Sequence, residues 1–155
     1  MRVEILAVGR LKAGAPEREL VARYLDRAAA AGRVVGLTGF EVAEVGEGRD
    51  VAAESRALLA RLPAGARRIV LDERGRALSS RELARRIAGW RDEGASAAAF
   101  LIGGADGHDV SVRTGADLVL SLGPMTWPHQ LVRALIAEQL YRAVTILGGH
   151  PYHRD

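Results

Sequence analysis

The side chains best suited to acid–base chemistry gather in the last third of this chain. All four histidines fall there, at positions 108, 129, 150 and 153. The chain ends in His150-Pro151-Tyr152-His153-Arg154-Asp155, and a frayed terminus rarely needs two His, a Tyr and an Arg within six residues. Histidine titrates near neutral pH, and such clusters are typical of functional sites. We therefore expect a functional role for this tail.

A metal site is one interpretation of these histidines, but their spacing does not favour it. No carboxylates stand at ligand spacing with them. The chain has no cysteine, which excludes disulfides, thiolate nucleophiles and cysteine-containing metal sites. Its single lysine, Lys12, lies outside any G-x-x-x-x-G-K-[ST] motif, so a P-loop nucleotidase is excluded as well. We expect no metal.

Two segments rich in glycine or proline follow expected strands. Gly103-Gly104-x-x-Gly107 departs from the dinucleotide-binding pattern G-x-G-x-x-G, and a plain tight turn would also explain it. Backbone without side chains can also let a planar ligand approach closely. The second segment, 122–128, holds two prolines, a glycine, a Met and a Trp. It suits an adenine or methionine moiety held by backbone groups.

Strands and helices are expected to alternate around these segments. Apolar patterning predicts strands at 3–8, 34–45, 68–72, 98–102 and 118–122, and helices at 16–31, 51–62, 79–93 and 130–146, with a turn at 73–76. This order predicts a single α/β domain over residues 1–155, with a mostly parallel sheet covered by helices on both faces. Ligands bind such sheets at the carboxyl ends of the strands, where Leu71-Asp72, Gly103-Gly104 and 122–127 would lie.

Composition indicates an ordinary globular protein, with 48% hydrophobic and 26% charged residues among 155. No apolar run reaches the roughly 18 residues of a membrane span, and the first residues lack the features of a signal peptide. We expect a cytoplasmic protein without a membrane partner. Eight arginines and three acidic residues lie between Arg67 and Arg91. This basic strip fits a polyanionic partner, although a solvated helix face in an arginine-rich proteome would also produce it.

About the last 90 residues carry five ordered motifs, at 71–75 with 79–80, 100–107, 120–133, 138–143 and 150–154. In order and spacing these motifs resemble the RlmH family of ribosomal RNA methyltransferases, within the SPOUT superfamily. The first 65 residues match mainly in length and in the opening strand. A smaller apolar residue is common where Trp127 stands, and lysines often replace the arginines of 74–91.

The resemblance implies a C-terminal trefoil knot that builds a site for S-adenosylmethionine, a feature no periodicity argument would give because knots are nearly absent from proteins. It also implies a homodimer that acts on the ribosome and methylates N3 of a pseudouridine in large-subunit rRNA, in the helix 69 hairpin that faces the decoding site. DNA is not an expected partner. Carried over by position, the cofactor contacts are Leu71, Gly103, Gly104, Leu122, Gly123, Pro124, Met125, Thr126 and Trp127.

The resemblance also gives the tail a chemical role. Methyl transfer is an in-line displacement, so the enzyme must place N3 opposite the methyl group, remove the N3 proton and exclude water. His153 would accept the proton and Arg154 would stabilise the anion. Tyr152 would stack on or hydrogen-bond a flipped base. His129 and Arg133, at the start of the last helix, are second candidates for positioning.

Two other classes of function stay open. A non-catalytic ribosome- or RNA-binding module could use the arginine strip, but it would need neither the glycine-rich strand exit nor the aromatic tail. A small-molecule hydrolase should have a G-x-S-x-G nucleophile elbow, which is absent. The last helix has more apolar residues than one sheet-facing stripe requires, which favours a dimer interface. Such a dimer would place the tail beside the partner's cofactor pocket.

Overall fold

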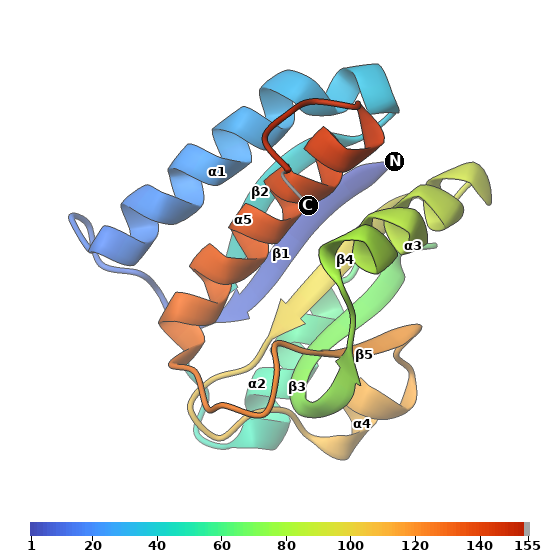
Figure 1. Ribbon diagram of the computed structural model, residues 1–155. Coiled ribbons are helices and arrows are strands. Elements are labelled where there is room, and N and C mark those ends of the chain that lie inside the picture. Colours follow the sequence, from blue (N-terminus) through green and yellow to red (C-terminus); the bar gives the residue numbers. More distant parts are fainter. Residues whose placement is uncertain (154–155) are drawn as a thin grey trace.

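The computed structural model describes residues 1–153, which fold around one parallel sheet (Figure 1). The sheet order is β2-β1-β4-β3-β5, and all four neighbouring pairs are parallel. The strands are β1 (Arg2–Val8), β2 (Thr38–Val45), β3 (Arg67–Ala77), β4 (Ala97–Ile102) and β5 (Leu118–Ser121). The helices are α1 (Pro16–Gly32), η1 (Arg33–Val35), α2 (Val51–Arg61), α3 (Ser80–Asp92), α4 (Val110–Thr114) and α5 (His129–Leu147). The predicted α/β class is confirmed.

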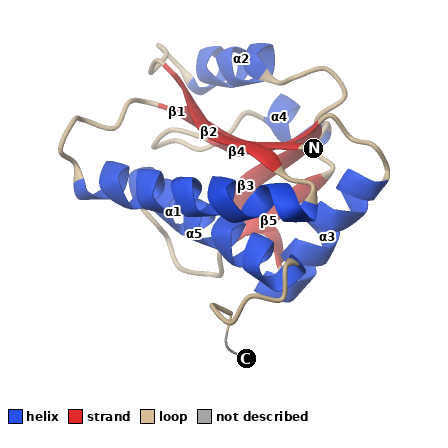
Figure 2. Cartoon of the chain, turned by 90° about the horizontal axis from the view of Figure 1, so that it is seen from above, coloured by secondary structure: helices blue, strands red, loops and turns tan. Residues whose placement is uncertain are grey.

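Helices cover both faces of the sheet, as the sequence predicts. Figure 2 shows α1, α3 and α5 on one face and α2 and α4 on the other. The central strands β1 and β4 are therefore buried on both sides, and every residue of β4 is buried. Such strands need continuous apolar runs rather than alternation, and this is the pattern of the sequence there.

Side-chain caps fix where two of the helices begin. Asp50 Oδ1 accepts a hydrogen bond from Ala53 N at 2.7 Å at the start of α2. Ser79 and Glu82 form a capping box at the start of α3, in which each side chain bonds the other residue's backbone N–H. Both caps satisfy N–H groups that have no partner inside the helix. The predicted starts of these two helices are confirmed.

Two predicted boundaries are wrong. Residues 33–35 form a turn of 3₁₀ helix instead of a strand, because Gly36 takes a left-handed conformation (φ 72°) that ends the helix, and β2 begins only at Thr38. The expected turn at 73–76 belongs to a long, irregular β3. Both Leu71 and Arg76 pair with Leu120, so the residues between them bulge out of the sheet and return to it.

Candidate functional site

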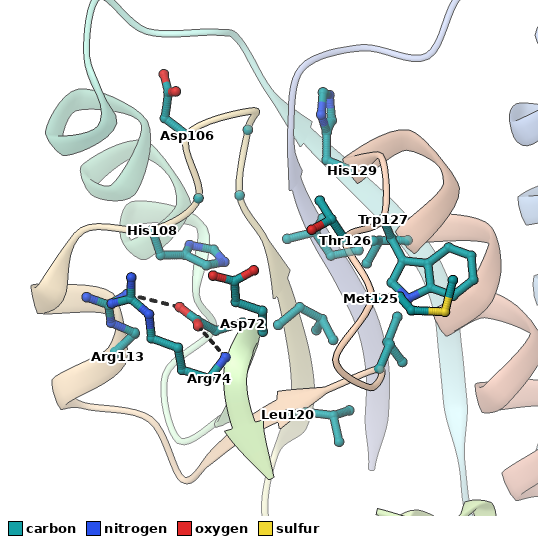
Figure 3. Close-up of a pocket in the computed structure, with 18 of the residues that line it drawn as sticks. Asp72, Arg74, Asp106, His108, Arg113, Leu120, Met125, Thr126, Trp127 and His129 are labelled. Atoms are coloured by element: carbon teal, nitrogen blue, oxygen red, sulfur yellow. Dashed lines mark hydrogen bonds and ion pairs between the residues drawn. The ribbon is translucent and has the colours of Figure 1, made fainter. Parts of the chain in front are cut away.

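Three strand exits meet in one pocket at the carboxyl ends of β3, β4 and β5 (Figure 3). Its volume of about 290 Å³ is near the lower end of the range for small-molecule sites. The apolar residues that line it are Leu71, Ile102, Leu120, Leu122, Met125, Trp127 and Val132. A ring system with a short polar chain fits a pocket of this size and character.

Eight of the nine residues predicted to contact a cofactor line this pocket. They are Leu71, Gly103, Gly104, Leu122, Gly123, Met125, Thr126 and Trp127. The ninth, Pro124, is not among the lining residues, although both of its neighbours are. His129, predicted as a positioning residue, lines the pocket as well. Segments that lie far apart in the sequence are thus brought together as expected.

The glycine-rich exit of β4 is a closed turn with no space for a side chain at Gly103. Gly107 N donates to Gly104 O at 3.1 Å. A Cβ atom on Gly103 would lie 2.4 Å from the backbone oxygen of Gly107, which is too short for a real contact, so the fold itself requires glycine at this position. A Cβ atom on Gly104 would lie 2.9 Å from Glu54 Oε2, the end of a side chain that can move away. The result is a pocket wall made of bare backbone.

The loop after β5 forms the opposite wall. Gly123 N donates to Ser121 Oγ at 3.1 Å, and Gly123 has a φ of 102°, a conformation that favours glycine. Met125 is 66% exposed and Trp127 is 36% exposed. Figure 3 draws both side chains on the same side of the pocket. Large exposed apolar side chains beside a pocket are typical of a ligand or protein contact.

An ion pair forms the polar side of the pocket. Arg113 Nη1 lies 3.0 Å from Asp72 Oδ2, and Arg74 N donates to Asp72 Oδ1 at 2.9 Å. Partial burial acts to raise the pKa of Asp72, but these two hydrogen bonds outweigh it and hold that pKa below its ordinary value. The pair also fixes the bulge of β3 to α4.

His108 is a buried part of the pocket wall. Its Nε2 atom lies 3.2 Å from the carbonyl oxygen of Leu101, and the residue is 7% exposed. Burial lowers the pKa of His108, and the contacts with Leu101 and Asp72 offset this only in part. In the sequence, His108 stands out only as a candidate metal ligand, and Arg113 does not stand out at all. The position of His108 directly after the glycine-rich exit was the available signal.

Arg133, the other second-rank candidate, lies away from the pocket. It is 1% exposed, and its guanidinium donates to the carbonyl oxygens of Val8 and Gly9 and pairs with Glu44 at 2.9 Å. Arg133 therefore links the start of α5 to the ends of β1 and β2 through hydrogen bonds and an ion pair.

Tyr152, in the described part of the tail, packs on α5 and does not line the pocket of its own chain. Tyr152 Oη donates to Glu138 Oε1 at 3.1 Å, and its ring centroid lies 4.5 Å from that of Tyr141. Burial raises the pKa of Tyr152 to about 12, helped by the Glu138 carboxylate. His153 is half-buried, and within the described chain its Nδ1 atom has no hydrogen-bond partner. Arg154 lies outside the described residues.

The helix itself keeps the tail and the pocket apart. His129, the first residue of α5, lines the pocket, and Glu138 lies nine residues further along. At about 1.5 Å per residue this is roughly 13 Å along the axis. Neither Tyr152 nor His153 is among the residues that line the pocket. The structure thus brings the predicted cofactor contacts together and leaves the predicted tail chemistry elsewhere.

Within residues 1–153, no three His, Asp or Glu side chains gather as a metal ligand set. Likewise, none of the helices in this part of the chain combines the length and apolar character that crossing a membrane requires.

A parallel α/β sheet with a backbone-walled pocket at its carboxyl edge defines a protein that binds a small ligand where its strands end. Comparison with known proteins identifies the family. The chain belongs to the SPOUT methyltransferases, because a family model described as "Predicted SPOUT methyltransferase" matches residues 1–153.

Several similar proteins share one name, Ribosomal RNA large subunit methyltransferase H. The protein of this name from Maricaulis maris (strain MCS10) is 57% identical over 157 residues, covering 100% of both chains. That from Rhizobium etli is 59% identical over 160 residues, covering 99% of both. A solved structure, a probable methylase family protein from Haemophilus influenzae Rd KW20, has a TM-score of 0.51 at 13% identity over 99% of this chain and 70% of that one. That structure supports the fold alone.

Proposed function

We propose that this protein is a cytoplasmic S-adenosylmethionine-dependent methyltransferase that modifies N3 of a pseudouridine in the helix 69 hairpin of large-subunit rRNA. The observation that carries the proposal is the pocket, where three distant segments meet and eight of the nine expected cofactor contacts lie. The shared name of the similar proteins supports large-subunit rRNA as the substrate. The C-terminal knot is part of this proposal.

The chemistry of the pocket suits the methyl donor. Its apolar floor and the bare backbone at Gly103 fit an adenine ring, because a flat ring can lie directly against peptide groups. Three carboxylates and two guanidinium groups also line it, and because Arg113 pairs with Asp72, the carboxylates of Glu73 and Asp106 outnumber the remaining cation, Arg74. This balance would favour a cationic ligand. When bound, the donor supplies an electrophilic methyl group on a positively charged sulfur.

The chain's own residues would prepare the nucleophile. We assign removal of the N3 proton to His153 and stabilisation of the resulting anion to Arg154. Tyr152 has its hydroxyl bonded to Glu138 and its ring packed on Tyr141, which supports a positioning role for it instead of stacking on the base. His129 lies in the pocket wall, where it would help to position the substrate.

The site would be shared between two copies of the chain. Tyr152 is held against α5, and neither Tyr152 nor His153 lines the pocket of its own chain, which supports supply of His153 and Arg154 by a second copy. Leu131, Leu135 and Leu147 are only half-buried in one chain although they lie on an otherwise well-packed helix. Exposed Met125 and Trp127 beside the pocket also fit cover by a partner.

The test is methyl transfer from a radiolabelled donor to ribosomes that lack the modification, followed by mass spectrometry of the digested rRNA. We expect label on one pseudouridine of the helix 69 hairpin, with far less on deproteinised rRNA, since so small a domain must rely on the shape of the ribosome for recognition. Stable binding to ribosomes without transfer of label would instead establish the non-catalytic binding module.

A further inference from the structure

The arginines between Arg67 and Arg91 do not form one surface. Arg67 pairs with Asp117 at 3.0 Å and with Glu93 at 2.8 Å. Arg91 pairs with Asp92 and donates to the carbonyl oxygen of Val35. These arginines connect neighbouring parts of the fold, so they are poor candidates for a polyanionic partner.

Three other arginines line a groove of about 340 Å³ beside α3, which we call the α3 groove. They are Arg76, Arg85 and Arg86, and all three are exposed. No carboxylate of residues 1–153 forms an ion pair with any of them. The remaining lining residues are Leu78, Glu82, Gly89, Trp90 and Glu93.

The two acidic residues of the α3 groove already have partners. Glu82 Oε2 accepts from Ser79 N at 2.7 Å and from Ser79 Oγ at 2.8 Å, which completes the capping box. Glu93 Oε2 accepts from Arg67. The charge of Glu93 is matched by Arg67, which lies outside the groove lining. The carboxylate of Glu82 acts electrostatically on Arg76 and Arg85 without forming an ion pair with either, so three guanidinium groups face one uncompensated carboxylate and the groove keeps an excess of positive charge. Guanidinium geometry matches phosphate oxygens.

The floor of the α3 groove leaves space for a ligand. Gly89 lies in the interior of α3, where glycine costs roughly 1 kcal/mol of helix stability relative to alanine. A Cβ atom there would meet nothing within 4 Å, so packing does not demand the glycine. Arg86 lies over the ring of Trp90 with its Cζ atom 5.8 Å from the centroid, which orients one of the three charges.

The α3 groove adjoins the candidate site. Arg74 lines the pocket, and Arg76, two residues further along β3, lines the groove. Two residues of extended chain span at most about 7 Å. A molecule lying in the groove would therefore pass the mouth of the pocket.

We propose that the α3 groove binds the phosphodiester backbone of double-stranded RNA next to the base that enters the pocket. Charge complementarity favours this occupant, because three exposed guanidinium groups without ion-pair partners attract a dense anion and the stem of an rRNA hairpin supplies one. The inference rests on the proposed function and deepens it, since it names the part of the chain that holds the RNA.

The test replaces all three arginines with glutamine (Arg76→Gln, Arg85→Gln, Arg86→Gln) and measures binding of a fluorescent 20-base-pair RNA duplex by anisotropy at several salt concentrations, without methyl donor. The matched control carries Arg49→Gln, Arg56→Gln and Arg61→Gln, which remove the same charge on and next to α2, on the opposite face of the sheet (Figure 2).

We expect the groove variant to bind the duplex at least about tenfold more weakly. The slope of the logarithm of its binding constant against the logarithm of the salt concentration should be smaller by about 2–3. The control should stay within about threefold of wild type. Equal losses in both variants would show a net-charge effect and overturn the proposal.

A second pair of variants tests whether weaker RNA binding results from unfolding instead of from the changed charge of the α3 groove. Gly89→Glu and Gly89→Gln both introduce better helix formers, so neither should lower the melting temperature. Gly89→Glu should weaken duplex binding more than Gly89→Gln, because it adds a negative charge to the groove. Equal binding by the two variants would contradict the proposal.

Two further readouts separate this inference from the proposed function. Calorimetry with S-adenosylmethionine should give the same affinity for the triple groove variant as for wild type. If wild type itself binds no donor while the groove variant still loses RNA, the groove is established and the methyltransferase function fails. If the groove variant dissociates in sedimentation and keeps its RNA affinity, the groove is an interface between copies and the inference is overturned.

Discussion

Tyr152 and Glu138 fix the C-terminal tail to the middle of α5. The Tyr152 hydroxyl donates to Glu138 Oε1 at 3.1 Å, and the same oxygen accepts from Arg142 Nη2 at 2.6 Å. The Arg142 guanidinium in turn lies 5.0 Å from the centre of the Tyr152 ring. Three residues thus hold Tyr152 against the middle of α5.

Removing the Tyr152 hydroxyl should slow methyl transfer without changing donor binding. A hydrogen bond to a charged group contributes roughly 1.5–3 kcal/mol, so Tyr152→Phe should lower kcat by about tenfold or more. The ring still packs on Tyr141 in this variant, and the Kd for S-adenosylmethionine from calorimetry should match wild type. A raised Kd with unchanged kcat would place Tyr152 in the donor site instead.

Thermal stability should fall in mild acid because of His108. Burial lowers the pKa of His108 in the folded chain, whereas an unfolded histidine titrates near 6.5. As the pH falls below about 6.5, His108 takes up a proton in the unfolded chain but not yet in the folded one. Proton binding therefore favours the unfolded chain, and the free energy of unfolding falls until the pH reaches the pKa of His108 in the folded chain. The melting temperature should drop less between pH 7.5 and 5 for His108→Leu than for wild type. Parallel curves for the two proteins would contradict this assignment.

The turn at Gly103 should tolerate no side chain. A methyl group there would lie 2.4 Å from Gly107 O, so Gly103→Ala must open the turn and displace the pocket wall. We expect donor affinity to fall by about tenfold or more, equivalent to roughly 1.4 kcal/mol. Gly46→Ala is the matched control, because a Cβ atom at Gly46 meets nothing within 4 Å. Equal donor affinity in both variants would exclude close contact between ligand and backbone at Gly103.

Arg133 should contribute more to stability than an exposed arginine does. Arg133→Met removes a donor from the carbonyl oxygens of Val8 and Gly9, and leaves the carboxylate of Glu44 without its ion pair, with only the hydrogen bond from Leu11 N. Loss of one partner from such a buried network costs about 3 kcal/mol, measurable by urea denaturation. Arg2→Met is the control, because Arg2 pairs with Glu41 at the exposed surface and should cost less than about 1 kcal/mol. Similar decreases in the free energy of unfolding for the two variants would show that the contacts of Arg133 do not stabilise the fold.

Much of the fold follows from local signals in the sequence. The apolar run of β4 and the capping box at Ser79 are properties of neighbouring residues, and the structure confirms both. The ends of parallel strands meet at one edge, so the pocket could be predicted from Leu71, Gly103 and 122–127 once the strands were assigned.

Contacts between distant segments could not be predicted in this way. Arg133 has a polar side chain on a helix, and only the approach of β1 and β2 shows that its charge is buried. The bulge at 72–75 depends on Arg113, about 40 residues later, and on Gly75, where a Cβ atom would lie 2.6 Å from Val119 O. Local patterns carry no information on such pairings.

Subunit complementation tests the shared site most directly. One variant, Gly103→Trp, should lose donor binding, and the other, Arg154→Ala, should lose turnover while its donor affinity stays unchanged. Each is inactive alone. In a heterodimer purified through two different tags, one of the two sites combines an intact pocket with an intact tail from the partner, so methyl transfer to ribosomes should return to about half of the wild-type rate. Complete inactivity of verified heterodimers would show that pocket and tail act within one chain and would contradict the account.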